Sequence, residues 1–307
     1  MIRLSSLMGI ILFFGTIFIP INAKGADAPL KLTPMPFNTE MDEDDPLLVP
    51  SLSSIYPPRF YFSRKNEKGK YSIYYSKFLK KNNKWGTPET IGAYVDTESD
   101  DRSCFLTEEG KFPQTIIYAT KKDKLNNNFD LFRSFRDQPG KDMEDRAFNP
   151  GKPLLALDTE TDEMHPWLTK DQSTLYFSRK TKDGWQQMVA KRVKGSGTEG
   201  NFDAPEPVKD LPIGFHHATT TPLGNLMFLE CISDDGRSEI FSCTKTLSGG
   251  WSKPIAVSNL KDSTGKIGTK SPSLSKDGLK LYFASDRAGG QGGLDIYSAT
   301  VLELKLK

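Results

Sequence analysis

Short apolar stretches recur along the chain, and each is bounded by turn-forming residues such as glycine, proline, asparagine or aspartate. They are rich in β-branched and aromatic residues and partly alternate with polar ones, as half-buried strands require. After residue 30 no segment has the 3.6-residue periodicity of a long amphipathic helix. The pattern therefore predicts an all-β protein. Its clearest strands fall at residues 59–64, 115–120, 175–179, 226–229 and 281–285.

These strands return at a nearly constant interval. When one residue of each strand is taken as a marker, the successive steps are 56, 59, 51 and 55 residues. Further strands follow in each unit, and the outermost contains proline, which suits an edge strand because proline cannot donate to a ladder. Four-stranded antiparallel units of this length, repeated radially, are typical of propeller blades. The markers are Phe62, Tyr118, Phe177, Phe228 and Phe283.

The fifth unit lacks an outer strand of its own. Residues 29–37 stand just before the first unit, where every other unit has its outer strand, so we expect them to complete the last blade and hide its edge. The alternating residues 301–307 are the alternative. The predicted fold is a five-bladed β-propeller of four-stranded antiparallel blades, closed by an N-terminal strand. The blades are expected at about residues 46–95, 96–157, 158–214, 215–268, and 269–307 plus 29–37.

The last unit resembles the TolB-type, WD-like β-propeller repeat. The similarity lies in a Ser-Lys-Asp-Gly turn at residues 275–278, the strand at 281–285, Asp286-Arg287, a glycine-rich loop and the sequence Asp-Ile-Tyr at 295–297. This resemblance implies a propeller fold and an extracytoplasmic binding or scaffold role. It implies no catalytic residue.

The N-terminus predicts export. Residues 1–23 resemble a secretory signal, with Arg3, an apolar core and Ala23 as the cleavage point, and no nearby cysteine suggests lipoprotein processing. An uncleaved anchor is the alternative. We therefore expect residues 24–307 to form a single periplasmic or secreted domain, monomeric and not membrane-spanning. The chain has 41 basic and 39 acidic residues, and no basic stripe stands apart from compensating acidic residues. This charge pattern argues against nucleic acid as a partner.

An acidic hexapeptide of the form Asx-Thr-Glu-x-Asp-acid precedes the innermost strand of three blades, at residues 38–43, 96–101 and 158–163. Its carboxylates could bind calcium or catalyse glycoside cleavage. Its repetition favours a structural function, in which the side chains cap the inter-blade turns and bind backbone amides. We predict no cofactor, with calcium as the alternative. The catalytic alternative would use Asp45, Asp101 and either Glu163 or Glu230.

Histidines supply a second candidate site. His165 and His216 both lie twelve residues before the marker of their blade, as does Ser271, and Asp45 and Ser103 are the approximate counterparts. Such a polar ring at the mouth of the channel could bind a metal or a small polar ligand, or simply consist of hydrogen-bonded neutral histidines. His217 replaces the proline found in other blades, which makes the fourth blade exceptional.

These features favour one function and leave others open. The main interpretation is an exported, non-catalytic propeller that binds a protein or polysaccharide of the cell envelope. The alternatives are a carbohydrate-active enzyme of the glycoside hydrolase type and a calcium-stabilised structural domain. A serine hydrolase is not supported, because the Gly-x-Ser-x-Gly motif does not occur.

Overall fold

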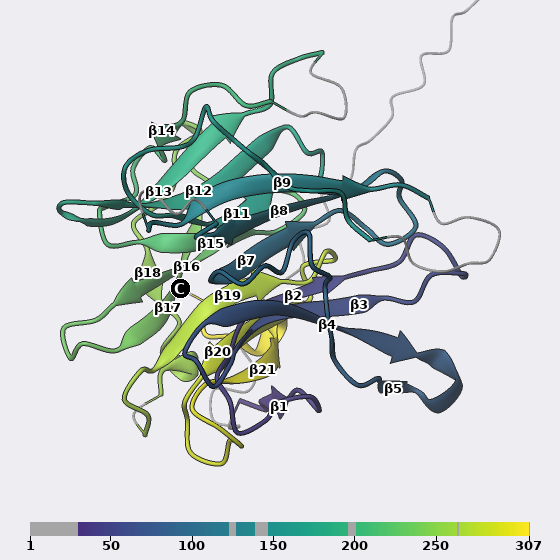
Figure 1. The fold of residues 1–307 in the computed structure, drawn as a ribbon. Coiled ribbons are helices and arrows are strands. Elements are labelled where there is room, and N and C mark those ends of the chain that lie inside the picture. The colour runs from purple at the N-terminus through teal and green to yellow at the C-terminus, as the bar shows by residue number, and fades with distance from the viewer. Residues whose placement is uncertain (1–29, 123–126, 139–146, 196–200, 263, 307) are drawn as a thin grey trace, which may run out of the picture.

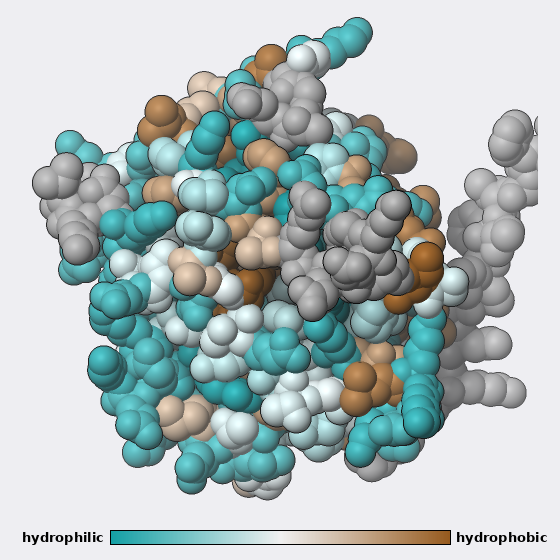
Figure 2. Space-filling model, turned by 45° about the vertical axis from the view of Figure 1, so that its right-hand side comes forward, coloured by the Kyte–Doolittle hydropathy of each residue, from teal (hydrophilic) through white to brown (hydrophobic). Residues whose placement is uncertain are grey.

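The computed structural model describes residues 30–122, 127–138, 147–195, 201–262 and 264–306. These residues form five antiparallel sheets around a central axis, with short 3-10 turns as their only helical elements (Figure 1). The prediction of an all-β, five-bladed propeller is confirmed. Figure 2 shows a face on which hydrophilic residues predominate and apolar ones are scattered, as is normal for a protein surface.

Each blade is a meander whose first strand lies innermost. The outermost strands span only two residues and three of them contain proline, as an edge position allows.

Blade 1 is β2 (Glu43–Val49), β3 (Arg59–Lys65), β4 (Tyr71–Leu79) and β6 (Glu89–Thr90), with β5 (Lys84–Trp85) also on β4. Blade 2 is β7 (Asp101–Leu106), β8 (Gln114–Thr120), β9 (Asp130–Arg136) and β10 (Lys152–Pro153). Blade 3 is β11 (Glu163–Leu168), β12 (Thr174–Thr181), β13 (Gly184–Lys191) and β14 (Glu206–Pro207). Blade 4 is β15 (His216–Thr220), β16 (Leu226–Ile232), β17 (Ser238–Thr244) and β18 (Ile255–Ala256). Blade 5 is β19 (Thr269–Leu274), β20 (Lys280–Ser285), β21 (Asp295–Thr300) and β1 (Thr33–Pro34).

The ring is closed by the N-terminal strand, as the sequence predicts. β1 pairs antiparallel with β21, with Thr33 opposite Ser298. The competing C-terminal segment instead forms a 3-10 turn at Val301–Glu303. Just after β1, Phe37 stacks on Phe62 with ring centroids 4.8 Å apart, so the first and last blades share an aromatic cluster of their own.

The acidic hexapeptides hold neighbouring blades together. In blade 3, Glu163 accepts hydrogen bonds from Thr159 N at 3.1 Å and from Arg179 Nε at 2.8 Å, while Asp162 accepts one from Phe129 N of blade 2 at 2.9 Å. The first two blades repeat this arrangement. There Asp42 binds Leu294 N, Asp100 binds Tyr71 N, Glu43 binds Thr39, and Asp101 binds Thr97.

The first position of the hexapeptide leads to a stability prediction. In blade 1 it is Asn38, whose amide donates to Ile296 O and accepts from Ile296 N. In blade 2 it is Asp96, and desolvation by burial raises its pKa to about 6. The folded state therefore binds this proton more tightly than the unfolded state, so Asp96 costs stability once the pH rises through the interval from about 4 to about 6.

We expect Asp96→Asn to stabilise the protein by about 1 kcal/mol at pH 7, allowing for the partial exposure of the side chain. The new amide would occupy the position that Asn38 has in blade 1, where the amide donates to Ile296 O. Urea unfolding at pH 4.0 and pH 7.5 measures this effect. The gain should be small at the lower pH, and an equal gain at both pH values would contradict the argument.

Within the described part of the chain, no helix is long and apolar enough to cross a membrane. The predicted signal at residues 1–23 lies outside the described residues.

Candidate functional site on the propeller axis

Every innermost strand has a bulge at the same place. The pairing of each first strand with the second shifts register there, and one residue adopts a left-handed backbone conformation. Such a conformation is uncommon for residues other than glycine, although Asn, Asp and His tolerate it best. Five equivalent bulges bring five side chains to one level of the axis. The residues and their φ angles are Asp45 (50°), Ser103 (52°), His165 (55°), His217 (54°) and Ser271 (53°).

The predicted ring therefore needs one correction, because His217 and not His216 occupies its position in blade 4. In blade 4, His216 pairs with Glu230, and the equivalent pair in blade 3 is Met164 with Ser178. The residue before Ser178 is the blade 3 marker Phe177, so its counterpart in blade 4 is the residue before Glu230, which is Leu229. The sequence pattern had instead indicated Phe228, one residue earlier, as the marker of blade 4. Met227, Phe228 and Leu229 are all fully buried. A uniformly apolar strand gives no sign of which residue faces which side, and the count was wrong by one.

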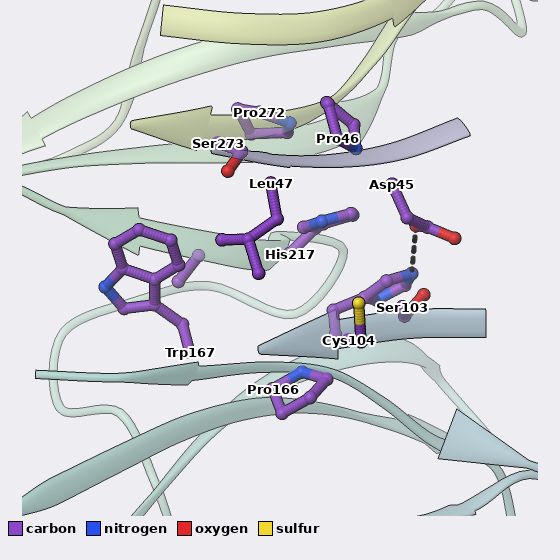
Figure 3. Close-up of a pocket in the computed structure, with 12 residues that line it drawn as sticks. Asp45, Pro46, Leu47, Ser103, Cys104, Pro166, Trp167, His217, Pro272 and Ser273 are labelled. Carbon is purple, nitrogen blue, oxygen red and sulfur yellow. Dashed lines mark ion pairs between the residues drawn. The ribbon is translucent and has the colours of Figure 1, made fainter. Parts of the chain in front are cut away.

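Four of the five ring residues line a cavity of about 20 Å³ in the channel. Asp45, Ser103 and His217 lie on its polar wall, while Leu47 and Trp167 close the opposite side (Figure 3), and His165 also lines it. A cavity of this size accommodates one water molecule or one ion, and needs polar groups around it to do so. A sugar ring does not fit inside.

The two histidines in this wall face each other. The rings of His165 and His217 stack with centroids 3.9 Å apart, and His165 Nε2 lies 4.0 Å from Asp45 Oδ1, the contact drawn as a dashed line in Figure 3. Desolvation lowers the pKa of His165 well below its ordinary value and that of His217 to about 4. Both imidazoles are therefore neutral at pH 7.

A buried ion cluster lies behind the wall. Asp44 Oδ2 is 2.6 Å from Arg102 Nη2 of blade 2 and 2.6 Å from Lys270 Nζ of blade 5. Arg102 Nε also lies 3.0 Å from Asp45 Oδ2. Burial opposes the charge on Asp44, but Lys270 and Arg102 outweigh it and hold the pKa of Asp44 well below its usual range. The cluster joins blades 1, 2 and 5.

Glu230 of blade 4 completes the charged surroundings. It accepts hydrogen bonds from Ser271 N at 3.0 Å and Ser238 Oγ at 2.8 Å. Its two oxygens also lie 3.8 Å from His216 Nε2 and from His217 Nδ1. Burial by itself would raise the pKa of Glu230, but Lys270 and the two histidines lower it overall. Glu230 is therefore a carboxylate at pH 7.

The structure separates the predicted residues into two groups. Asp45, Ser103, His165, His217, Ser271 and Glu230 meet at the axis, with His216 beside them, stacked on Trp185 at 5.3 Å. Asp101 and Glu163 instead hydrogen-bond to threonines of the inter-blade turns and do not line the cavity. Desolvation by burial raises the pKa of both.

Sequence reasoning missed Asp44, Arg102 and Lys270. They occupy one register position, immediately before the bulge in blades 1, 2 and 5. A charged residue at the same place in three strands that are otherwise buried was the available signal, because such charges are buried only when they are paired.

No protein-family model matches the chain, and no curated protein matches it in sequence. The fold is shared with solved glycoside hydrolases. The GH43_1 enzyme from Xanthomonas citri, solved with xylotriose, aligns with a TM-score of 0.59 at 12% identity, covering 89% of this chain and 90% of that one. The catalytic domain of a Coprinopsis cinerea GH62 alpha-L-arabinofuranosidase aligns with a TM-score of 0.58 at 11% identity, covering 91% and 100%. At these identities the likeness establishes the fold alone.

TolB from Acinetobacter baumannii aligns with a TM-score of 0.48 at 14% identity, covering 85% of this chain and 55% of that one. A TM-score of 0.48 is too low to support an inference. The five-bladed fold is confirmed, and the rest of the resemblance to the TolB-type repeat stays a prediction. The comparisons also correct the main functional interpretation. The structures of like fold are mostly GH43 and GH62 glycoside hydrolases, so the expectation of a non-catalytic binding module is not carried further.

Proposed function

We propose that this protein is a carbohydrate-active enzyme of the glycoside hydrolase type, with its reacting groups on the propeller axis. The observation that carries the proposal is the pair of buried carboxylates, Asp45 and Glu230, on either side of the stacked histidines. The fold shared with glycoside hydrolases supports it. The proposed site includes neither Asp101 nor Glu163, because their carboxylates are engaged in the turns.

Hydrolysis of a glycosidic bond uses two carboxyl groups. One protonates the leaving oxygen, and the other acts as a base on water or as a nucleophile on the sugar carbon. Asp45 suits the second role, because its Oδ1 lines the cavity and has no hydrogen-bond partner among the described residues. Glu230 would then deliver the proton from its protonated form; because its pKa is lowered, that form is a minor one at pH 7, and activity should rise as the pH falls. Since the cavity is too small for a sugar, the substrate would present only its scissile bond to the opening.

The substrate class follows from the same proposal. Pentose-containing polysaccharides are the first choice, since the neighbours include an arabinofuranosidase and an enzyme solved with xylotriose. Export, which residues 1–23 predict, would bring the protein to polysaccharides outside the cytoplasm.

The test is hydrolysis of aryl α-L-arabinofuranosides, aryl β-D-xylosides and arabinoxylan by residues 24–307. We expect Asp45→Asn and Glu230→Gln each to lower the rate by about 10²–10⁴-fold, because each removes one proton-transfer or nucleophilic group. Asp171→Asn, in an exposed turn of blade 3, is the matched control and should retain full activity. Folded protein that cleaves none of these substrates, or an Asp45→Asn variant as active as wild type, would refute the proposal.

A further inference from the structure

Three side chains at the axis have the arrangement of a metal site. One oxygen of Asp45 and one ring nitrogen each of His165 and His217 lie within 4.8 Å of one another. They come from blades 1, 3 and 4, and each occupies the left-handed position of its innermost strand. All three line the cavity, where Figure 3 shows Asp45 and His217, so they converge on a space of the size of an ion.

Two of these groups are buried with an atom that has no hydrogen bond, and the nearest ionisable neighbours of these atoms lie at 3.8–4.0 Å. Asp45 is 5% exposed and His217 is 9% exposed, yet Asp45 Oδ1 and His217 Nδ1 have no hydrogen bond within the described ranges. The Oγ of Ser103, on the same wall, also has none. Burying a polar atom without a partner costs about 1–3 kcal/mol, and native proteins rarely leave several such atoms around one cavity. A bound cation with one water would satisfy them.

The donor set selects the kind of metal. Two imidazoles and one carboxylate suit zinc and the neighbouring first-row divalent ions, whereas calcium takes six to eight oxygen ligands. His165 also has the outer partner that a metal-ligating histidine requires on its second ring nitrogen. His165 Nδ1 lies 3.1 Å from Ser178 Oγ, which leaves Nε2 toward Asp45, and the same hydroxyl accepts a hydrogen bond from the backbone N of His217.

We propose that the propeller axis binds one zinc-like divalent metal ion through Asp45, His165 and His217, with a water molecule in the fourth position. The proposal goes beyond hydrolysis and does not depend on it, because metal binding is measured without substrate. In the metal-bound protein Asp45 would be a ligand of the ion and not the nucleophile. A small inward movement of the three side chains would bring them from their present spacing to bonding distance of a shared ion.

The experiment uses tag-free residues 24–307, stripped with a chelator and titrated with Zn²⁺, Co²⁺ and Ca²⁺ by calorimetry. We expect one equivalent of zinc or cobalt to bind and calcium not to compete. The cobalt form should show the visible absorption bands of a four- or five-coordinate ion. Zinc should also raise the melting temperature of the wild-type protein.

Variants locate the ion. His217→Ala and Asp45→Asn should each weaken zinc binding by about 100-fold or more, since even changes outside the first ligands cost 10–100-fold. His216→Ala is the matched control, because His216 is adjacent in sequence but packs on Trp185 and lies outside the cluster, so it should bind zinc as the wild type does. Circular dichroism checks that each variant folds.

Three results would overturn the proposal. They are wild-type protein that binds neither zinc nor cobalt at one equivalent, calcium binding more tightly than zinc, and equal zinc affinity in the His217→Ala and His216→Ala proteins. Loss of glycoside cleavage with zinc binding intact would instead count against the proposed function alone, so the two proposals fail separately.

Discussion

Replacing Asp44 with alanine is expected to lower the free energy of unfolding by about 3–5 kcal/mol, the cost of leaving buried charges without their partner. Asp44 is fully buried and accepts from Arg102, Lys270 and Ser271, the last at 2.5 Å between the Ser271 and Asp44 oxygens. Its removal leaves the Lys270 ammonium without its nearest anion inside the ring. Urea-induced unfolding followed by circular dichroism measures the loss.

The pH dependence of this effect has a definite sign. Because the pKa of Asp44 is lowered in the folded protein, its contribution is complete above the unfolded pKa near 4 and declines progressively as the pH falls from there toward the folded pKa. The deficit of Asp44→Ala should therefore be constant from about pH 5 to pH 8.

Asp235→Ala is the control for Asp44→Ala. Asp235 forms an ion pair with Arg237 in an exposed turn, where water screens the charges, so the midpoint of unfolding should barely change. If Asp44→Ala unfolds at the same urea concentration as this control, the buried cluster does not hold blades 1, 2 and 5 together.

Replacing Phe37 with alanine is expected to lower the free energy of unfolding by about 3–5 kcal/mol and also to make the protein self-associate. Phe37 is 5% exposed and packs on Phe62 and Phe60 in the cluster between the first and last blades. Its loss should loosen β1 from β21 and expose a strand edge. Thermal unfolding measures the first effect, and size-exclusion chromatography with light scattering measures the second.

Phe202→Ala separates the two effects. Phe202 is 4% exposed but belongs to the outer part of blade 3, where it lies near Arg192 and has no part in ring closure. This variant should be destabilised by a similar amount and stay monomeric. Equal self-association in both variants would mean that general loss of packing, and not an opened ring, causes it.

The sequence by itself determined the architecture of this protein. Each blade carries its own strands and turns, and the hexapeptides recur because every inter-blade turn needs the same hydrogen bonds, as Thr39 with Glu43 and Thr159 with Glu163 make them. Even the ring closure by β1 follows from a local count, since one blade lacks an outer strand and the N-terminus supplies it. Local periodicity and repetition suffice for such features.

Only the tertiary structure decided the site. The choice between His216 and His217 depends on a bulge in β15 and on its register with the neighbouring strand. Residues Met227–Leu229 of that strand are uniformly apolar and buried, so their sequence does not show which of them faces which side of the sheet. The pairing of Asp44 with Lys270 joins residues 226 positions apart. Such contacts arise because closure of the ring brings the first and last blades together, and no local pattern in the chain encodes which charges then meet.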